Sequence, residues 1–243
     1  MDQIVERGKP ADYGQELIRR RARITTSFLS LRGRNILDFG SGNGAQTIEL
    51  AKRGCRIVAC DIDAVDLAVL SDYVTAHKIH NVTPTLYDGV NVPAADATFD
   101  AAVSYAVLEH VNDEAQALAE IHRVLKDGAE FLIAVPNKWW IFETHGARLP
   151  LLPWNRVPFF SWLPGPIHGR FARARIYTRK GITALLKRNG FEVLRTCYMT
   201  APIDVVKSPA LKSFLRKTIF RRDVTGLPVL ATEIFVLCRR IST

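Results

Sequence analysis

The strongest constraint on the fold is the way short apolar runs alternate with segments of helical periodicity between residues 34 and 137. The runs typical of strands cover 34–40, 56–63, 81–89, 98–111 and 129–137. The segments with helical spacing cover 45–54, 64–78 and 113–128, of which the first and the last end in glycine. This alternation is typical of parallel βαβ units, whose right-handed crossovers place helices on both faces of one sheet.

The remainder of the chain extends the pattern. It predicts a helix at 177–190 and two further strands at 191–199 and 229–240. We therefore predict an α/β fold with a doubly wound, mostly parallel sheet of about seven strands. Because 48% of the 243 residues are apolar, one domain spanning 1–243 with an insertion can bury a sizeable core.

Two absences in the sequence bear on where the protein acts. No apolar run approaches the ~18 residues that a bilayer-spanning helix needs, and residues 1–15 are charged and lack the apolar stretch of a signal peptide. These features predict a soluble, cytoplasmic protein. The four cysteines show no metal-ligand spacing, so we expect reduced thiols and no metal site.

A glycine-rich turn follows the first strand-like run, in the sequence ILDFGSGNG at 36–44. A nucleoside triphosphate loop would end in Gly-Lys-Ser/Thr, and this turn has no lysine. A dinucleotide site remains open, because residues 40–45 fit G-x-G-x-x-A and Asp61 follows at the interval of a ribose-binding acid. Asp38 argues against it: a carboxylate repels a pyrophosphate but attracts the ammonium and sulfonium groups of S-adenosylmethionine. Asp38 could also serve as a cap for the amides of the turn.

The chain resembles the class I S-adenosylmethionine-dependent methyltransferases that modify small molecules and lipids. The resemblance covers 35–136 and resumes at 176–198, and it rests on ILDFGSGNG, VACDID, LYDGVNVPAADATFDAAVSYAVLEHV and VLKDGAEFLIAVPN. It implies a Rossmann-like sheet of order 3-2-1-4-5-7-6 with the last strand antiparallel, and S-adenosylmethionine as cofactor. The implied cofactor-binding residues are Asp38, Gly40, Ser41, Gly42, Gly44, Asp61, Ile62, Asp88, Gly89, Ser104 and Tyr105. Among these, the resemblance assigns Asp61 to the ribose hydroxyls and Asp88 to the adenine amino group.

Methyl transfer to a hydroxyl is helped by a base that removes the proton. His110, in the LEHV segment after the fourth predicted strand, is the first candidate, and His145, in the insertion, is the second. His110 could instead cap or pack beneath the cofactor.

Two segments suggest what lies beyond the cofactor site. The insertion at 137–175 contains all four tryptophans and five of the twelve prolines, which is typical of a substrate cap for an apolar or lipid-linked acceptor. The segment 208–223 predicts a basic amphipathic helix between the last two strands. Both could touch an anionic membrane, although self-packing would explain each of them as well. The sequence does not determine the oligomeric state.

Two other functions stay open. The G-x-G-x-x-A match permits an NAD(P)-dependent oxidoreductase. The basic C-terminal third permits a non-enzymatic module that binds an anionic membrane or RNA, although no RNA-binding motif is present and we consider nucleic acid a minor alternative.

Overall fold

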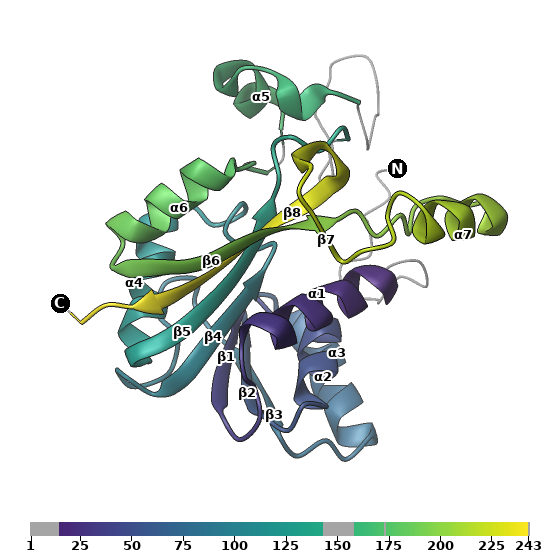
Figure 1. The fold of residues 1–243 in the computed structure, drawn as a ribbon. Helices are drawn as coiled ribbons and strands as arrows, with labels where there is room; N and C mark the ends of the chain where they lie inside the picture. The colour runs from purple at the N-terminus through teal and green to yellow at the C-terminus, as the bar shows by residue number, and fades with distance from the viewer. Residues whose placement is uncertain (1–14, 143–157, 173, 243) are drawn as a thin grey trace.

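The computed structural model describes residues 15–142, 158–172 and 174–242. One sheet of eight strands forms its centre, in the order β3-β2-β1-β4-β5-β8-β6-β7 (Figure 1). The strands are β1 (Asn35–Phe39), β2 (Arg56–Asp61), β3 (Val82–Leu86), β4 (Phe99–Tyr105), β5 (Leu125–Pro136), β6 (Phe191–Thr200), β7 (Val224–Thr225) and β8 (Ala231–Arg240). The α-helices are α1 (Gln15–Phe28), α2 (Ala45–Ala51), α3 (Ala64–Ala76), α4 (Glu114–Val124), α5 (Gly165–Phe171), α6 (Arg179–Arg188) and α7 (Pro209–Lys217), and the 3₁₀ turns are η1 (Phe160–Trp162) and η2 (Pro228–Leu230).

The pairing of the strands confirms the predicted doubly wound sheet. Strands β3, β2, β1, β4 and β5 are parallel neighbours, and β8 runs antiparallel to both β5 and β6. With β8 in the place of the predicted last strand, the order is the expected 3-2-1-4-5-7-6. The sheet has eight strands because the two-residue β7 adds a short antiparallel pair at the end of β6.

The sheet separates two hydrophobic layers. On one face, residues of α4 and α6 such as Leu118 and Ile182 pack on Phe99 and Phe131. On the other face, α1, α2 and α3 cover the sheet through side chains that include Ile24, Leu50 and Leu70. Figure 1 shows these two groups of helices on opposite sides of the strands.

Helix α1 was not predicted from the sequence. Its sequence, QELIRRRARITTSF, is mostly polar, and yet Arg20, Ala22, Ile24 and Thr25 are buried. Arg20 is buried because its guanidinium donates to the carbonyl oxygens of Thr200, Ala201 and Phe220. These acceptors are 180 to 200 residues away in the sequence, so local periodicity could not reveal them.

Two predicted helix ends are wrong. The helix predicted over 113–128 ends at Val124, and Leu125 starts β5 by pairing with Phe99, so Gly128 lies within the strand. The basic helix predicted over 208–223 begins as expected, with Ser208 accepting a hydrogen bond from the Leu211 amide, but it ends at Lys217. Thr218 leaves the helical region of backbone conformation there, with φ −113° and ψ −90°.

Candidate functional site

The glycine turn between β1 and α2 is fastened to the end of β2. The amides of Gly40 and Ser41 both donate to the Cys60 carbonyl oxygen, at 2.8 and 2.9 Å. Gly40 has φ +78°, and a Cβ at this position would lie 2.2 Å from a Val107 methyl group. A side chain at position 40 would therefore force the turn away from the segment that follows β4.

The other two glycines differ in what they face. Gly44 also has a positive φ, and a Cβ there would lie 2.2 Å from the Leu70 side chain. At Gly42, by contrast, the nearest atom to an added Cβ is an Asp66 carboxylate oxygen at 3.8 Å, so the turn is open there. Beside it, the Ser41 hydroxyl is buried and has no hydrogen-bond partner in the described part of the chain. An open backbone with an unpaired hydroxyl is what a polar ligand would fill.

Asp38 is the next-to-last residue of β1, beneath this turn. Its carboxylate is buried and accepts a hydrogen bond from the Thr47 hydroxyl of α2 at 2.6 Å. Burial raises the pKa of Asp38 to about 6, and the nearby charge of Asp61 adds to the rise. A cationic ligand group at this position would oppose that rise.

Asp61, at the end of β2, accepts the hydrogen bond from an amide of the turn that the sequence had suggested for Asp38. One carboxylate oxygen accepts from the Gly42 amide at 2.6 Å and the other accepts from the Asp63 amide at 3.0 Å. Each oxygen of a carboxylate can accept a second hydrogen bond, so both remain able to accept from a diol. Asp61 thus fixes the turn and faces the same space.

Ile62 and the loop after β3 form the next wall. Ile62 is 62% exposed, and a Cβ at Gly89 would lie 3.7 Å from its side chain. The Asp88 carboxylate is exposed and accepts from the amides of Val90 and Asn91 at 2.8 and 2.6 Å. These bonds, with Asn91 the largest contributor, lower the pKa of Asp88, so the group is ionised at neutral pH.

Ser104 and Tyr105, at the end of β4, are both buried. The Tyr105 hydroxyl forms a 2.6 Å hydrogen bond with the Thr25 hydroxyl of α1, and the Arg21 guanidinium lies 5.6 Å from its ring centre. Burial raises the pKa of Tyr105 far above its usual range. The phenol is therefore engaged with α1.

Glu109 is a residue that the sequence reasoning missed. It lies in the segment after β4 and is only 2% exposed. Burial raises its pKa to about 8, with Glu233 adding to the rise and Arg21 opposing it. Arg21 itself forms an ion pair with Glu233 of β8. The sequence held no signal for this cluster, because α1, β4 and β8 are far apart in the chain.

His110 is exposed and lies beside Glu109 at the entrance of a cavity of about 570 Å³. The cavity separates the segment after β4 from α5 and is lined by polar side chains that include Glu109, His110, Glu114, Lys138, His168 and Arg175. Arg175 holds its wall together by donating to the carbonyl oxygens of Val111 and Asn112, at 2.5 and 3.1 Å. His145, the second predicted base, lies outside the described residues.

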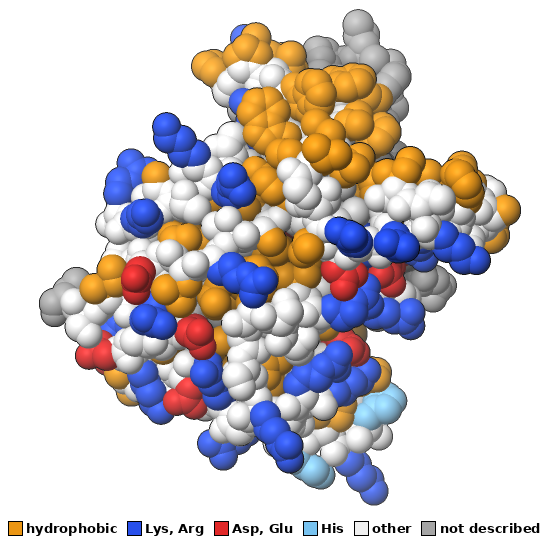
Figure 2. Space-filling view, viewed as in Figure 1, with side chains coloured by type: hydrophobic (Ala, Val, Ile, Leu, Met, Phe, Trp, Pro, Cys, Tyr) orange, Lys and Arg blue, Asp and Glu red, His pale blue; other side chains and the backbone are white. Residues whose placement is uncertain are grey.

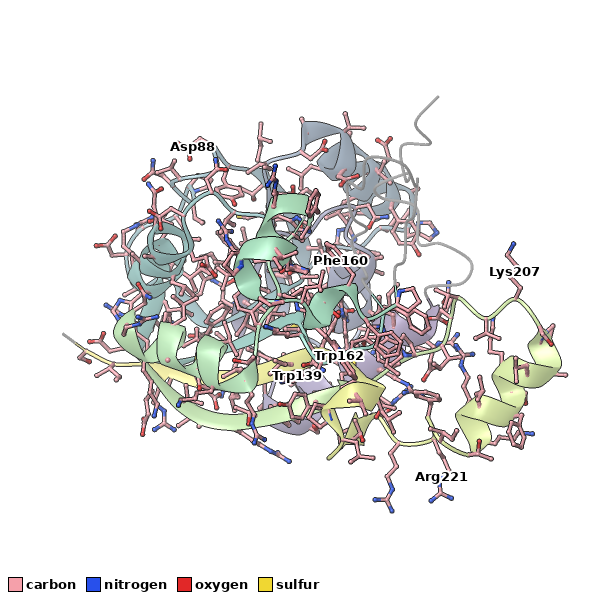
Figure 3. All side chains as sticks on the ribbon, turned by 90° about the horizontal axis from the view of Figure 1, so that it is seen from above. Asp88, Trp139, Phe160, Trp162, Lys207 and Arg221 are labelled. Carbon is pink, nitrogen blue, oxygen red and sulfur yellow. The ribbon has the colours of Figure 1, made fainter. Side chains whose placement is uncertain are left out.

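The described part of the cap lies above the sheet. Viewed from above, Trp139 and Trp162 are neighbours next to Phe160 (Figure 3), and the Trp162 indole donates to the Trp139 carbonyl oxygen at 3.2 Å. Ser161 donates to the Trp140 carbonyl oxygen at 2.8 Å, which joins η1 to the end of β5. In the part of the chain that the structure describes, no group of three His, Cys, Asp or Glu side chains is arranged to hold a metal ion, and all four cysteines are free thiols.

The fold thus brings Asp38, Asp61, Asp88 and the open glycine turn to one edge of the sheet. Parallel strands end at that edge, beside the point where the strand order reverses between β1 and β4. Three carboxylates around an open turn with no lysine or arginine of its own fit a ligand with cationic groups and hydroxyls, such as S-adenosylmethionine. Of these carboxylates, Asp38 lies beneath the turn, where it would repel a pyrophosphate.

Comparisons with known proteins agree with this chemistry. Residues 37–133 match the family described as a methyltransferase domain. The chain is 36% identical over 123 residues to a demethylmenaquinone methyltransferase of Corynebacterium efficiens, a match that covers 50% of each chain. It is 28% identical over 152 residues to a ubiquinone biosynthesis O-methyltransferase of Pseudomonas aeruginosa, covering 59% of this chain and 64% of that one.

The fold itself is matched over almost the whole chain. A crystal structure of an S-adenosylmethionine-dependent methyltransferase from Aquifex aeolicus superposes with a TM-score of 0.63 and 16% sequence identity, covering 95% of this chain and 94% of that one. The sequence matches to curated relatives are shorter. The match spans about half the length of the demethylmenaquinone methyltransferase.

Proposed function

We propose that the chain is a class I S-adenosylmethionine-dependent methyltransferase that transfers a methyl group to an oxygen atom of a small, apolar or lipid-linked acceptor. The match of residues 37–133 to the methyltransferase-domain family supports this. The observation that supports this best is the set of three carboxylates, Asp38, Asp61 and Asp88, around the open glycine turn. S-adenosylmethionine supplies a methyl group that its sulfonium has already activated, so the main task of the protein is alignment.

The residues that would hold the cofactor follow from their positions. Asp61 faces the turn at the end of β2, where it would accept from the ribose hydroxyls. Asp88 and Gly89, with the exposed Ile62 against Gly89, would flank the adenine. Asp38 and the turn backbone at Gly40, Ser41, Gly42 and Gly44 would receive the cationic amino acid end, and Ser104 and Tyr105 bound the site from β4.

The cavity next to His110 is our candidate for the acceptor site. Its volume of about 570 Å³ is within the range of small-molecule sites. Its lining combines polar groups with the apolar side chains of Val111, Leu163 and Ile176, which suits an acceptor that has both an apolar part and hydroxyl groups. Two of the relatives are named for quinones, and one of them is an O-methyltransferase, which favours a hydroxylated ring of this type.

The described geometry makes His110 a candidate for the base. As the acceptor oxygen gains the methyl group, its proton has to leave, and the exposed His110 imidazole at the cavity entrance can accept it. His145 stays a second prediction.

The experiment that tests this function measures transfer of an isotope-labelled methyl group to a panel of catechols and hydroquinones with and without prenyl tails. We expect labelled ether products, and we expect His110→Gln to lower kcat by ~10²- to 10⁴-fold while the affinity for S-adenosylhomocysteine stays unchanged. Label found only on ring carbons, with no ether product, would contradict the O-methylation proposal, and an unchanged kcat in the variant would remove His110 from the mechanism.

A further inference from the structure

Helix α7 and the loop that follows it form an unusual part of the surface. None of the residues of α7 is buried, although the helix is amphipathic. The exposed apolar side chains here include Phe214 (61%) and Leu211 (49%) of α7 and Ile219 in the loop, and Leu227 and Val229 follow between β7 and β8. A helix that packed on its own domain would cover its apolar face. None of the described helices is both long and apolar enough to cross a bilayer.

The same surface continues onto the cap. A small hydrophobic cluster of Ala201, Ile203 and Phe220 packs against Leu215 of α7 and Trp140 of the cap. This cluster joins two segments that lie more than 60 residues apart in the sequence. The described part of the cap also exposes aromatic rings. Phe159 and Trp162 form an edge-to-face contact with their ring centroids 5.1 Å apart, and Trp139 and Trp162 are about 40% exposed.

We name this region the docking surface and define it by the exposed apolar residues of the two segments: Trp139, Phe142, Phe159, Trp162, Leu211, Phe214, Ile219, Leu227 and Val229. Figure 2 shows hydrophobic atoms gathered over the cap and along the upper side of α7. An exposed patch of this kind marks an interaction site.

Positive charge borders the docking surface. Residues 205–222 contain no Asp or Glu, and their cations are Lys207, Lys212, Arg216, Lys217, Arg221 and Arg222. Only Arg216 is in an ion pair within the described residues, with Asp204 at 2.6 Å. The other nearby acid, Asp223, is paired with Arg23 of α1.

The cations and the apolar side chains lie on different sides of α7. Figure 2 shows a row of Lys and Arg below the apolar side of the helix, and in Figure 3 Lys207 and Arg221 point outward from the body. This is the arrangement of a helix that lies in a membrane interface, with its apolar side in the acyl region and its cations at the headgroups. Single-stranded RNA would instead require aromatic rings and cations on one shared face.

We propose that the docking surface binds the surface of an anionic lipid bilayer, with Leu211 and Phe214 inserted and Lys217 and Arg221 at the headgroups. The aromatic rings of the cap are of the type that prefers the membrane interface. A further consequence, which rests on the proposed function, is that a lipid-linked acceptor would enter from the bilayer through the cap.

The test uses the full chain in vesicle flotation, with phosphatidylcholine vesicles containing 30% phosphatidylglycerol or none. We expect the protein to float with the anionic vesicles, and less so at high salt. Leu211→Ser with Phe214→Ser should lower the partition coefficient by ~10-fold or more. Lys217→Glu with Arg221→Glu should lower it by at least roughly 25-fold, since each lost cation weakens binding about fivefold and each new carboxylate is repelled by the anionic headgroups.

Matched controls change the same residue types elsewhere. Lys187→Glu with Arg188→Glu alters the same charge at the exposed end of α6, and Val69→Ser removes an exposed apolar side chain from α3. Both should float like the wild type. The proposal is overturned if the wild-type protein fails to float, if it floats equally with neutral vesicles, or if the α7 variants float like the controls. Salt-sensitive RNA binding without flotation would overturn it in favour of nucleic acid.

Titration with S-adenosylhomocysteine separates this proposal from the proposed function. The variants at Leu211, Phe214, Lys217 and Arg221 should bind it as the wild type does, because neither α7 nor the loop after it contributes a residue to the glycine turn. If these variants lose flotation and still bind S-adenosylhomocysteine, the result supports the docking surface and leaves the proposed function unaffected. If none of the proteins, including the wild type, binds S-adenosylhomocysteine, the result contradicts the proposed function and leaves the docking surface unaffected.

Discussion

At the scale of the residue, the glycine turn could be predicted because its requirements are local. Gly40 and Gly44 adopt positive φ angles, and the neighbouring side chains leave no room for a Cβ at either position. Both positions therefore require glycine, so the motif can be recognised from the sequence. Asp61 and Asp88 were assigned from the resemblance to the methyltransferases, and they lie at the end of β2 and just after β3; their binding roles stay predictions. Glu109 and Arg21 could not be predicted, since their burial depends on contacts between α1, β4 and β8.

Replacement of Asp61 by alanine tests the assignment of the ribose site. We expect a loss of ~1–3 kcal/mol in binding of S-adenosylhomocysteine, because the ribose hydroxyls lose a charged acceptor and the Gly42 amide loses its partner. Calorimetric titration measures the loss, and Asp72→Ala, an exposed acid on α3, serves as the control. Equal affinity in the two variants would refute the assignment of Asp61.

Glu109 gives the folded protein a pH dependence. The pKa of Glu109 in the folded state is about 8, above the ordinary value of 4.5. Between these two pH values, the carboxyl is protonated in the folded state and ionised in the unfolded state. Its contribution to stability is therefore complete below pH ~4.5 and is lost as the pH rises to ~8, by at most about 1.4 kcal/mol per pH unit. We expect Glu109→Gln to show a smaller decrease in Tm between pH 5 and 9 than the wild type. If the Tm of Glu109→Gln and of the wild type fell equally over this pH range, burial of the Glu109 carboxyl would not be the source of the pH dependence.

At the scale of the element, the periodic segments were predicted in position and type, but their ends were not. The hydrophobic pattern continues smoothly from α4 into β5, so only the pairing of Leu125 with Phe99 reveals where the helix stops. Helix α7 was predicted too long because its apolar stripe includes Ile219, which lies beyond the turn at Thr218. Helix α1 escaped prediction because tertiary bonds of Arg20 stabilise it.

Arg20 provides the test of that account of α1. Arg20→Met should lower the free energy of unfolding by about 3 kcal/mol, since it leaves the buried carbonyl oxygens of Thr200, Ala201 and Phe220 without their donor. Urea unfolding measures the effect, and hydrogen exchange should show lost protection at 200–222. Arg19→Met, on the exposed side of α1, is the matched control, and an equal loss in both would contradict the role of the buried guanidinium.

At the scale of the molecule, alternation of strands and helices was enough to predict the sheet, because parallel strands with right-handed crossovers permit few orders. That order collects the ends of β1, β2, β3 and β4 at one edge, and the antiparallel β8 brings Glu233 to the same edge by pairing with Pro136. The nature of the acceptor could not be predicted in this way, since the cap and the cavity beside His110 depend on an insertion without periodicity.

The central claim is that the acidic glycine turn holds S-adenosylmethionine. Calorimetric titration of the purified chain with S-adenosylhomocysteine, with NAD⁺ and NADP⁺ in parallel, tests it most directly. We predict micromolar binding of S-adenosylhomocysteine and none of either dinucleotide, because the Asp38 carboxylate beneath the turn would repel a pyrophosphate. Binding of a dinucleotide with none of S-adenosylhomocysteine would contradict the account and make the protein a nicotinamide-dependent oxidoreductase.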